Sequence, residues 1–383
     1  MFLSLLSTTL YLQLAFLPLK LTICETLSIG KPFGMAFGVT GGGDAKPDNP
    51  QTEEELISFL TDKTPRVIHI KKTFDFTRLG KKKTEKACAP WKECSNGNKV
   101  QYALNFKNWC NNKIYGEAGP EKKWKQVEYN DAAIQGIKLK SHKTILGIGK
   151  LAGIRGKGLI ITGEKNIIIR NIAITFLNPH LVWGGDAIAL GGVSKVWIDH
   201  CTIKDIGRMM ISSSNKPNKG LTLSNNLFDG RTTYSTNCKN QHYWGVYLSG
   251  PEDEVTMANN CMFNLSGRAP RVSGFGNVKL HYYNNFHTGG DGQAFIVSKG
   301  GTMLAEGNVF LNHEVKNQKA KATEENGGVL FAPFSDLEAA RCKAILGRSC
   351  EKNSLRKSSD MQFGKKPVAI GAFKVKHRNK WVL

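Results

Sequence analysis

Two arginines, Arg268 and Arg271, flank an Ala-Pro pair in a segment that otherwise has the composition of a β-strand. Proline restricts its own backbone and that of the residue before it, so both cations lie on a stiff piece of chain. Asp186 and Arg208 each precede a comparable short apolar run earlier in the sequence. One carboxylate and three guanidinium groups are therefore the first candidates for chemistry.

This set of charges narrows the possible reactions. Glycoside hydrolysis usually requires two carboxylates around the scissile bond, whereas Asp186 is the single acid of the set, and Asp199 and Asp205 are near it in sequence but unpaired. A serine nucleophile needs a paired histidine and acid, and His200 ends a strand-like run where a structural role is expected. β-Elimination on a uronic acid remains, because cations stabilise the enolate charge that develops. Arginine is less suited to remove the proton, since its guanidinium is rarely deprotonated.

These residues belong to a repeat that begins near residue 141. Each unit has a β-prone run, a Gly/Ser turn, a second β-prone run and usually an Asn; the units cover residues 159–171, 187–200, 209–226, 245–260, 271–285 and 294–308. Their spacing falls in the range of roughly 20 to 50 residues that is typical of solenoids. We therefore predict an all-β chain folded as a parallel β-helix. A β-sandwich is the alternative, but the Asn-Gly hairpin signals that it needs are scarce.

An asparagine recurs near the ends of the repeats, at Asn171, Asn225, Asn259, Asn284 and Asn308. A general preference of Asn for turns does not explain a common register. Stacked amides can form a hydrogen-bonded ladder, so we expect these side chains at one turn of successive coils.

In a β-helix, residues of one column in neighbouring coils lie about 4.8 Å apart. We align the first runs of the repeats on Leu190, Ile211, Leu248 and Val272. One column then contains, within one residue, Asp186, Arg208, Trp244 and Arg268, and another contains Tyr247 and Arg271. Such a face suits an extended sugar polymer, because aromatic rings bind the apolar faces of sugars and arginine binds carboxylates.

The composition predicts an anionic partner. The chain of 383 residues has a formal net charge of +22, which favours nucleic acid, anionic membrane or acidic polysaccharide. No recognised nucleic-acid-binding module is present, so nucleic acid is not expected. We expect a monomer.

The N-terminus predicts secretion. Residues 1–19 carry no charged side chain and are rich in Leu and Phe. We predict a signal peptide over residues 1–24, a single domain over residues 25–383 with a basic C-terminal tail, and no membrane association after cleavage. A buried first helix or a membrane anchor is the alternative for residues 1–24.

The cysteines agree with an oxidising destination. Loss of Cys24 with the signal leaves eight of the nine, none of them with the CxxC spacing of zinc sites, so disulfides are expected and zinc is not. Cys201 and Cys261 lie in apolar strand-like runs, and we interpret them as buried thiols.

Eight motifs carry a family resemblance: GVTGGGDA (38–45), WGGDAI (183–188), VWIDH (196–200), IGR (206–208), DGR (229–231), HYWGVYL (242–248), NLSGRAPRV (264–272) and AEGNVF (305–310). Together they resemble the pectin lyases of the pectate lyase superfamily (polysaccharide lyase family 1), most of all the fungal type. The resemblance covers most of the chain. It implies a single-stranded, right-handed parallel β-helix and a secreted enzyme that needs no cofactor or metal. The implied reaction is β-elimination on α-1,4-linked, methyl-esterified galacturonan (pectin), which yields 4,5-unsaturated oligogalacturonates.

The resemblance also assigns roles. Arg268 matches the arginine proposed as the catalytic base, Asp186 the acid of the site, and Arg208 the arginine that replaces calcium ligands of pectate lyases. Arg271 stands where the family usually has Lys, which keeps the charge but changes the geometry. The aromatic cleft of the family is matched by Trp91, Trp109, Trp183, Tyr243, Trp244 and Tyr247. Cysteine spacings resemble the family disulfides Cys88–Cys110, Cys94–Cys238 and Cys342–Cys350, whereas Cys201 and Cys261 have no family partner.

One departure and two alternatives accompany this interpretation. An expected cleft Trp is replaced by Lys113, which together with the net charge indicates a less esterified, more anionic substrate. A calcium-dependent pectate lyase is disfavoured because Arg208 puts a cation where the metal requires a carboxylate. A non-catalytic basic β-helix that adheres to cell-wall polyanions is disfavoured by the intact set of Asp186, Arg208 and Arg268.

Overall fold

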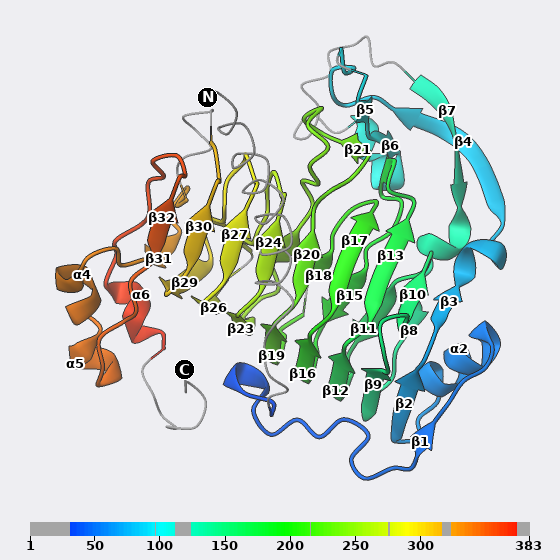
Figure 1. Cartoon of the computed structure of the whole chain (residues 1–383), viewed down its shortest axis with the longest axis horizontal. Coiled ribbons are helices and arrows are strands. Elements are labelled where there is room, and N and C mark those ends of the chain that lie inside the picture. Colours follow the sequence, from blue (N-terminus) through cyan, green and yellow to red (C-terminus); the bar gives the residue numbers. More distant parts are fainter. Residues whose placement is uncertain are drawn as a thin grey trace, which may run out of the picture. The chain divides into compact units, whose positions relative to one another are not determined.

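The computed structural model describes residues 31–95, 97–111, 124–214, 216–274, 276–315 and 323–373. From Pro32 onward the chain forms one unit, in which successive coils add strands to parallel sheets and wind into a right-handed β-helix (Figure 1). The predicted fold class is therefore confirmed. Three parts of the sequence predictions lie outside the described residues: the signal peptide, which includes Cys24; Lys113; and residues 374–383 of the basic tail. Among the described helices, none is long and apolar enough to span a membrane.

The largest sheet contains the second runs of the repeats. Its strands follow in the order β1 (Pro47–Asp48), β2 (Arg66–Ile70), β9 (Lys143–Gly147), β12 (Lys165–Arg170), β16 (Ser194–Asp199), β19 (Lys219–Ser224), β23 (Glu254–Ala258), β26 (Val278–Tyr283), β29 (Gly301–Glu306) and β31 (Val329–Phe331). Ile167, Val196 and Leu221 pair in register across β12, β16 and β19 and are fully buried. Each such side chain contributes about 1.5–3 kcal/mol by leaving water, so the stacked aliphatic columns drive the winding.

A second sheet contains the strands that follow the turn. Their order is β3 (Thr73–Asp75), β10 (Gly153–Arg155), β13 (Ala173–Leu177), β17 (Thr202–Ile206), β20 (Leu227–Asp229), β24 (Cys261–Phe263), β27 (Phe286–Thr288), β30 (Val309–Leu311) and β32 (Ser354–Arg356). The third sheet contains the first runs of the repeats, in the order β28 (Ile296–Val297), β25 (Arg271–Val272), β22 (Val246–Leu248), β18 (Ile211–Ser213), β15 (Ile188–Gly191), β11 (Leu159–Thr162) and β8 (Ile137–Lys138). The candidate site lies beside this third sheet.

The asparagine ladder exists, but one residue later than predicted. The amide Nδ2 of Asn226 donates to Oδ1 of Asn260 at 3.0 Å, and the chain of amides continues through Asn285, Asn308 and Asn353. Of the predicted members only Asn308 belongs to this ladder; the others, Asn171, Asn225, Asn259 and Asn284, have left-handed backbones with φ between 53° and 57°. Asn tolerates that conformation, so each of them makes a sharp turn, and the residues that follow Asn225, Asn259 and Asn284 form the ladder.

Both ends of the β-helix are covered. At the N-terminal end, helix α2 (Glu53–Thr61) is capped by Thr52, whose hydroxyl accepts from the Glu55 amide, and it places Leu56 and Leu60 in the core. At the C-terminal end lie α4 (Asp336–Ala340), α5 (Lys343–Leu346) and α6 (Val368–Gly371). Ile370 of α6 is buried against β31 and β29 there.

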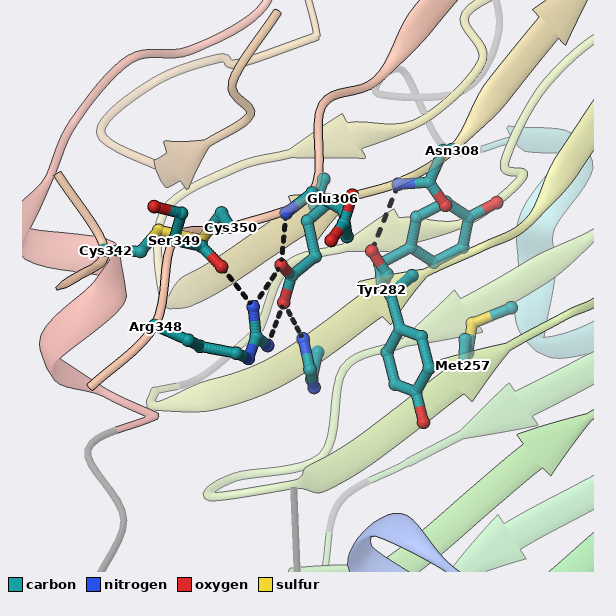
Figure 2. Close-up of polar contacts among 12 residues, drawn as sticks. Met257, Tyr282, Glu306, Asn308, Cys342, Arg348, Ser349 and Cys350 are labelled. Atoms are coloured by element: carbon teal, nitrogen blue, oxygen red, sulfur yellow. Dashed lines mark hydrogen bonds and ion pairs between the residues drawn. A yellow bond between two sulfur atoms is a disulfide. The ribbon is translucent and has the colours of Figure 1, made fainter. Parts of the chain in front are cut away.

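The C-terminal cover is fixed by a buried charge. Glu306 is fully buried at the end of β29 and accepts two hydrogen bonds from Arg348, at 2.8 and 2.9 Å, and one from His281 at 2.7 Å. Figure 2 shows Arg348 pointing at this carboxylate beside the Cys342–Cys350 disulfide. Burial alone would raise the pKa of Glu306, but these hydrogen bonds outweigh it and lower that pKa to about 2.

The cysteine predictions are confirmed in part. The structure contains the disulfides Cys88–Cys110, Cys94–Cys238 and Cys342–Cys350 that the family resemblance implied. Cys201 is a buried free thiol, as expected, and burial raises its pKa to about 12. Cys261 was wrongly interpreted as a thiol, because it is disulfide-bonded, with its partner outside the described residues.

Candidate active site

One wall of the site comes from a segment outside the repeats. Strands β4 (Lys82–Cys88) and β7 (Trp124–Asn130) pair antiparallel (Figure 1). Strand β6 (Tyr102–Leu104) pairs with both β4 and β14 (Leu181–Val182), and β5 (Lys99–Val100) pairs with β21 (Tyr234–Ser235). With the Cys94–Cys238 disulfide, these pairings fix the segment against the β-helix.

The opposite side comes from residues that precede strands of the third sheet. Tyr247 pairs with Arg271, as predicted, which places Trp244 level with Arg268. The predicted alignment of Ile211 with Leu190 was wrong. Ile211 pairs with Ile188, and Leu190 pairs with Ser213. The residue level with Asp186 and Trp244 is therefore Met209, and Arg208 lies one step before it. The alignment erred because the run MMISSS offers apolar residues at two registers.

Asp186 and Arg208 form a two-pronged ion pair. Nε of Arg208 donates to Oδ1 of Asp186 at 2.8 Å, and Nη2 donates to Oδ2 at 2.5 Å. The same carboxylate accepts from the Met209 amide at 3.0 Å and from the Ser212 hydroxyl at 3.1 Å. On its other face, Arg208 stacks on Trp183, with Cζ 4.0 Å from the ring centroid. Asp186 thus neutralises Arg208 and fixes its plane, since such paired hydrogen bonds are directional as well as strong.

Arg268 has a different environment. Its Cζ lies 4.7 Å from the ring centroid of Trp244, 4.9 Å from Tyr247 and 5.6 Å from Tyr243. Burial lowers the pKa of Arg268 below its ordinary value; the negative charge available on Tyr243 opposes that shift and the positive charge of Arg271 adds to it. Cation–π contacts with aromatic rings therefore hold this guanidinium, whereas a carboxylate holds that of Arg208.

The side chains of Arg268 and Arg271 each contain a hydrogen-bond donor that is not used within the described part of the chain. Within the described residues, the buried Nε atoms of Arg268 and Arg271 have no hydrogen-bond partner. A buried donor without a partner is costly and rare in proteins. Arg268 also has a left-handed backbone, with φ of 46°, and unusual backbone geometry of this kind concentrates at functional positions.

The aromatic residues form one cluster around a cleft. The six that the sequence predicted all pack together with Met209 and Val182, and they are Trp91, Trp109, Trp183, Tyr243, Trp244 and Tyr247. Their ring centroids lie 6.4 Å apart for Trp91–Trp109, 6.3 Å for Trp91–Trp244 and 5.0 Å for Tyr243–Trp244. Trp244 is 7% exposed, and its indole nitrogen donates to buried Gln101 at 3.0 Å, so this ring belongs to both the core and the cleft.

The cleft encloses about 280 Å³. It is lined by Phe106, Lys107, Trp109, Val182, Trp183, Arg208, Met209, Trp244, Tyr247 and Arg268. Among these lining residues there are cations and aromatic rings but no Asp or Glu. The volume is near the lower end for small-molecule pockets, about 300–1,000 Å³, which fits an open groove that takes one part of a polymer at a time.

Several residues of the site were missed by the sequence analysis. Phe106 and Lys107 lie in the 3₁₀ segment η3 (Phe106–Asn111), outside the repeats, where no periodicity marks them. Ser212 and Met209 hydrogen-bond to Asp186 from the repeat unit 209–226, in which only the apolar pattern was considered. His242 lies behind the arginines: its Nε2 contacts the carbonyls of Arg208 at 2.9 Å and Trp244 at 3.2 Å. Burial lowers the pKa of His242 to about 4, so it is neutral near pH 7 and donates to these carbonyls.

Asp199 and His200 lie elsewhere, at the end of β16. Asp199 is fully buried and accepts from Ser224 at 2.6 Å and Asn225 at 2.8 Å, and its Oδ2 lies 2.6 Å from Nδ1 of His200. Arg170 pairs with the same carboxylate at 3.1 Å. The VWIDH motif thus forms a polar brace at a turn, and His200 has the structural role that was expected.

Comparisons with known proteins agree with this geometry. A family model described as pectate lyase matches residues 121–354. The chain is 42% identical over 334 residues to the probable pectin lyase B of Aspergillus niger, covering 87% of this chain and 84% of that protein. This chain belongs to the pectate lyase family. It is also 43% identical over 330 residues to pectin lyase B of Emericella nidulans, covering 86% and 83% of the two chains. The family that the motifs predicted is therefore confirmed.

Solved structures support the fold. A polygalacturonate lyase fused to a self-assembling amphipathic peptide aligns with a TM-score of 0.50 at 19% identity, over 94% of this chain and 93% of that one. A pectate lyase bound to a hexasaccharide aligns with a TM-score of 0.50 at 18% identity, over 91% and 90% of the two chains. At this identity the likeness shows the shared β-helix and no more.

Proposed function

We propose that this chain is a pectin lyase that cleaves α-1,4-linked, methyl-esterified galacturonan by β-elimination. One observation carries the proposal: Arg268 presents a desolvated guanidinium, held by three aromatic rings and, within the described residues, by no carboxylate, at a cleft that also contains Arg208. A carbon acid next to an ester needs a base and a cationic environment for its developing enolate, and it needs no second carboxylate. The pectin lyases among its relatives support this assignment.

The residues divide the reaction between them. Arg268 accepts the proton from C5 of a galacturonate ester; burial lowers its pKa below the ordinary value, which is the direction that favours loss of its own proton. The electrons of the C5–H bond form the C4–C5 double bond as the C4–O bond breaks; the departing oxygen takes a proton from solvent water, and Arg268 returns the C5 proton to solvent. The donors of Arg208 that Asp186 leaves free, together with Arg271, stabilise the charge on the ester oxygen. The aromatic cluster binds the sugar faces.

A calcium-dependent mechanism fits this site poorly. Calcium takes about six to eight oxygen ligands, mostly carboxylate and carbonyl oxygens. Both oxygens of Asp186 already accept hydrogen bonds from Arg208, and they also accept from Met209 and Ser212. The guanidinium of Arg208 occupies the position beside this carboxylate and would repel a divalent cation. We therefore infer that turnover is independent of calcium.

We also propose that the protein is secreted as a monomer after removal of an N-terminal signal peptide, with pectin as its partner. The Cys88–Cys110, Cys94–Cys238 and Cys342–Cys350 disulfides support an oxidising destination.

The test of the function is direct. The product of β-elimination carries a double bond conjugated with the carboxyl group and absorbs ultraviolet light, whereas hydrolysis gives no such product. The purified enzyme should generate this absorbance from methyl-esterified pectin. A release of reducing ends without ultraviolet absorbance would refute the proposal.

A further inference from the structure

Lys107 is a cation that reaches the cleft from outside the β-helix. It lies in η3 with φ of 48°, next to Asn108 with φ of 61°, an uncommon backbone for residues other than glycine. The Asn105 side chain accepts from the Cys110 amide at 2.9 Å, and Cys110 is bonded to Cys88. This segment is therefore fixed locally, and it presents Lys107 to the cleft at a definite position.

A stack of rings connects Lys107 with the arginines. Its Nζ lies 5.5 Å from the ring centroid of Phe106, and Phe106 lies 4.9 Å from Trp183. Arg208 lies over the second of these rings, with Cζ 4.0 Å from the centroid of Trp183. Lys107 and Arg208 thus each lie over one ring of the Phe106–Trp183 pair and both line the cleft, so an oligosaccharide bound there lies near two cations.

The two cations differ in what neutralises them. Arg208 is paired with Asp186, but no Asp or Glu among the described residues lines the cleft where Lys107 ends. The sugars of a fully esterified chain are neutral. Toward such a chain, the aliphatic stem of Lys107 offers no more than an apolar side chain of similar length would. An exposed ammonium at this place gains most from an anion, because its hydrogen bonds to an ionised acceptor are stronger than those to neutral oxygens. The anions of pectin are the carboxylates of its unesterified residues.

We propose that Lys107 binds the free carboxylate of an unesterified galacturonate close to the reacting residue, which itself stays esterified. The preferred substrate is then pectin that is partly de-esterified, and Lys107 is the residue that sets this preference. This inference rests on the proposed function for the identity of the polymer. Charge-assisted hydrogen bonds give it its strength, because they are roughly twice as strong as neutral ones.

The experiment compares wild type, Lys107→Gln and Lys107→Arg on fully esterified pectin and on half-esterified pectin, by the ultraviolet absorbance of the product. On half-esterified pectin, Lys107→Gln should raise KM about tenfold, equivalent to about 1.4 kcal/mol, with kcat unchanged. On fully esterified pectin its KM should stay within about twofold of wild type, and Lys107→Arg should restore the wild-type KM on both. Added salt should raise the wild-type KM on half-esterified pectin and barely affect that of Lys107→Gln.

Lys125→Gln is the matched control. Lys125 also holds its ammonium over an aromatic ring, 5.0 Å from the centroid of Tyr102, but it does not line the cleft. This variant should leave both KM values unchanged. An equal rise in KM on both pectins for Lys107→Gln, or no rise on either, would overturn the proposal.

A binding measurement separates this inference from the proposed function. Tryptophan fluorescence should report the binding of unesterified and of fully methylated galacturonate hexamers, because the cleft contains several indoles. Lys107→Gln should lower the affinity for the unesterified hexamer alone. A wild type that binds in this pattern but forms no ultraviolet-absorbing product refutes the lyase assignment and leaves the Lys107 site standing. An identical loss for both hexamers refutes the Lys107 site.

Discussion

Replacement of Arg268 by lysine tests the proposed chemistry most directly. The guanidinium is held by three rings at 4.7, 4.9 and 5.6 Å, and its Nε is buried without a partner among the described residues. A lysine keeps the positive charge but loses the planar fork and the reach of the guanidinium. We expect substrate affinity to change little, because the aromatic cluster remains. Turnover should fall by roughly a hundredfold or more, about 3 kcal/mol, the usual loss for a group that acts in the transition state.

The pH dependence distinguishes a base from a purely electrostatic group. A base acts when deprotonated, so the rate rises with pH toward the pKa of residue 268. The ordinary pKa of lysine, about 10.4, lies below that of arginine at about 12.5 or higher. If Arg268 is the base, the rising limb of the pH–rate profile should shift to lower pH in Arg268→Lys. If the residue only stabilises charge, the variant should instead lose activity as the lysine deprotonates at high pH.

The assay is steady-state kinetics by ultraviolet absorbance, with binding followed by tryptophan fluorescence. Arg271→Lys is the control, because Arg271 is the adjacent cation and lysine is the residue that the family usually has there. It should stay within a few-fold of wild type. Near-normal turnover of Arg268→Lys would remove Arg268 from the mechanism.

Three further predictions follow from the structure. Full activity should persist in excess chelator; activity that is lost with chelator and returns with Ca²⁺ would favour a calcium-dependent pectate lyase. Trp244→Ala should lower the free energy of unfolding by about 3 kcal/mol, as the loss of a core aromatic residue does. Trp109→Ala should instead raise KM with little change in melting temperature. The reverse pattern of melting temperatures and KM values in the two variants would contradict the geometry. Glu306 has a pKa of about 2, below its ordinary 4.5, so its contribution is present above pH 4.5 and lost as pH falls toward 2. Wild type should lose about 3 kcal/mol of stability to this group over that range, and Glu306→Gln should lack this part of the pH dependence.

The sequence predicted the fold because each coil repeats the same physical requirement. Buried aliphatic residues such as Ile167, Val196 and Leu221 must stack in register, and that requirement leaves a visible pattern. The asparagine prediction failed by one residue because the ladder involves Asn-Asn pairs, Asn225-Asn226, Asn259-Asn260 and Asn284-Asn285. The first member makes the left-handed turn and the second bonds along the ladder. Composition does not distinguish two neighbouring residues of the same type.

The site was predictable only where it belongs to the repeats. Asp186 and Arg268 come from equivalent positions of two coils and Arg208 lies one residue from that position in a third, so an alignment of the repeats brings them together. Phe106 and Lys107 come from a segment that reaches the cleft through strand pairings and a disulfide formed with distant residues. No local pattern encodes such long-range contacts. The family resemblance supplied Trp91 and Trp109 from that segment, but nothing in their own spacing did.

In the proposed mechanism, the two arginines of the cleft perform two different tasks. Asp186 pairs with Arg208 and keeps it charged, which suits a group that must stabilise negative charge throughout the reaction. A carboxylate beside Arg268 would hold a proton on the guanidinium and oppose its action as a base. Aromatic rings hold the cation without a full negative charge, and burial favours the neutral form. The different partners of the two side chains, a carboxylate for Arg208 and rings for Arg268, therefore separate the electrostatic role from the proton-transfer role.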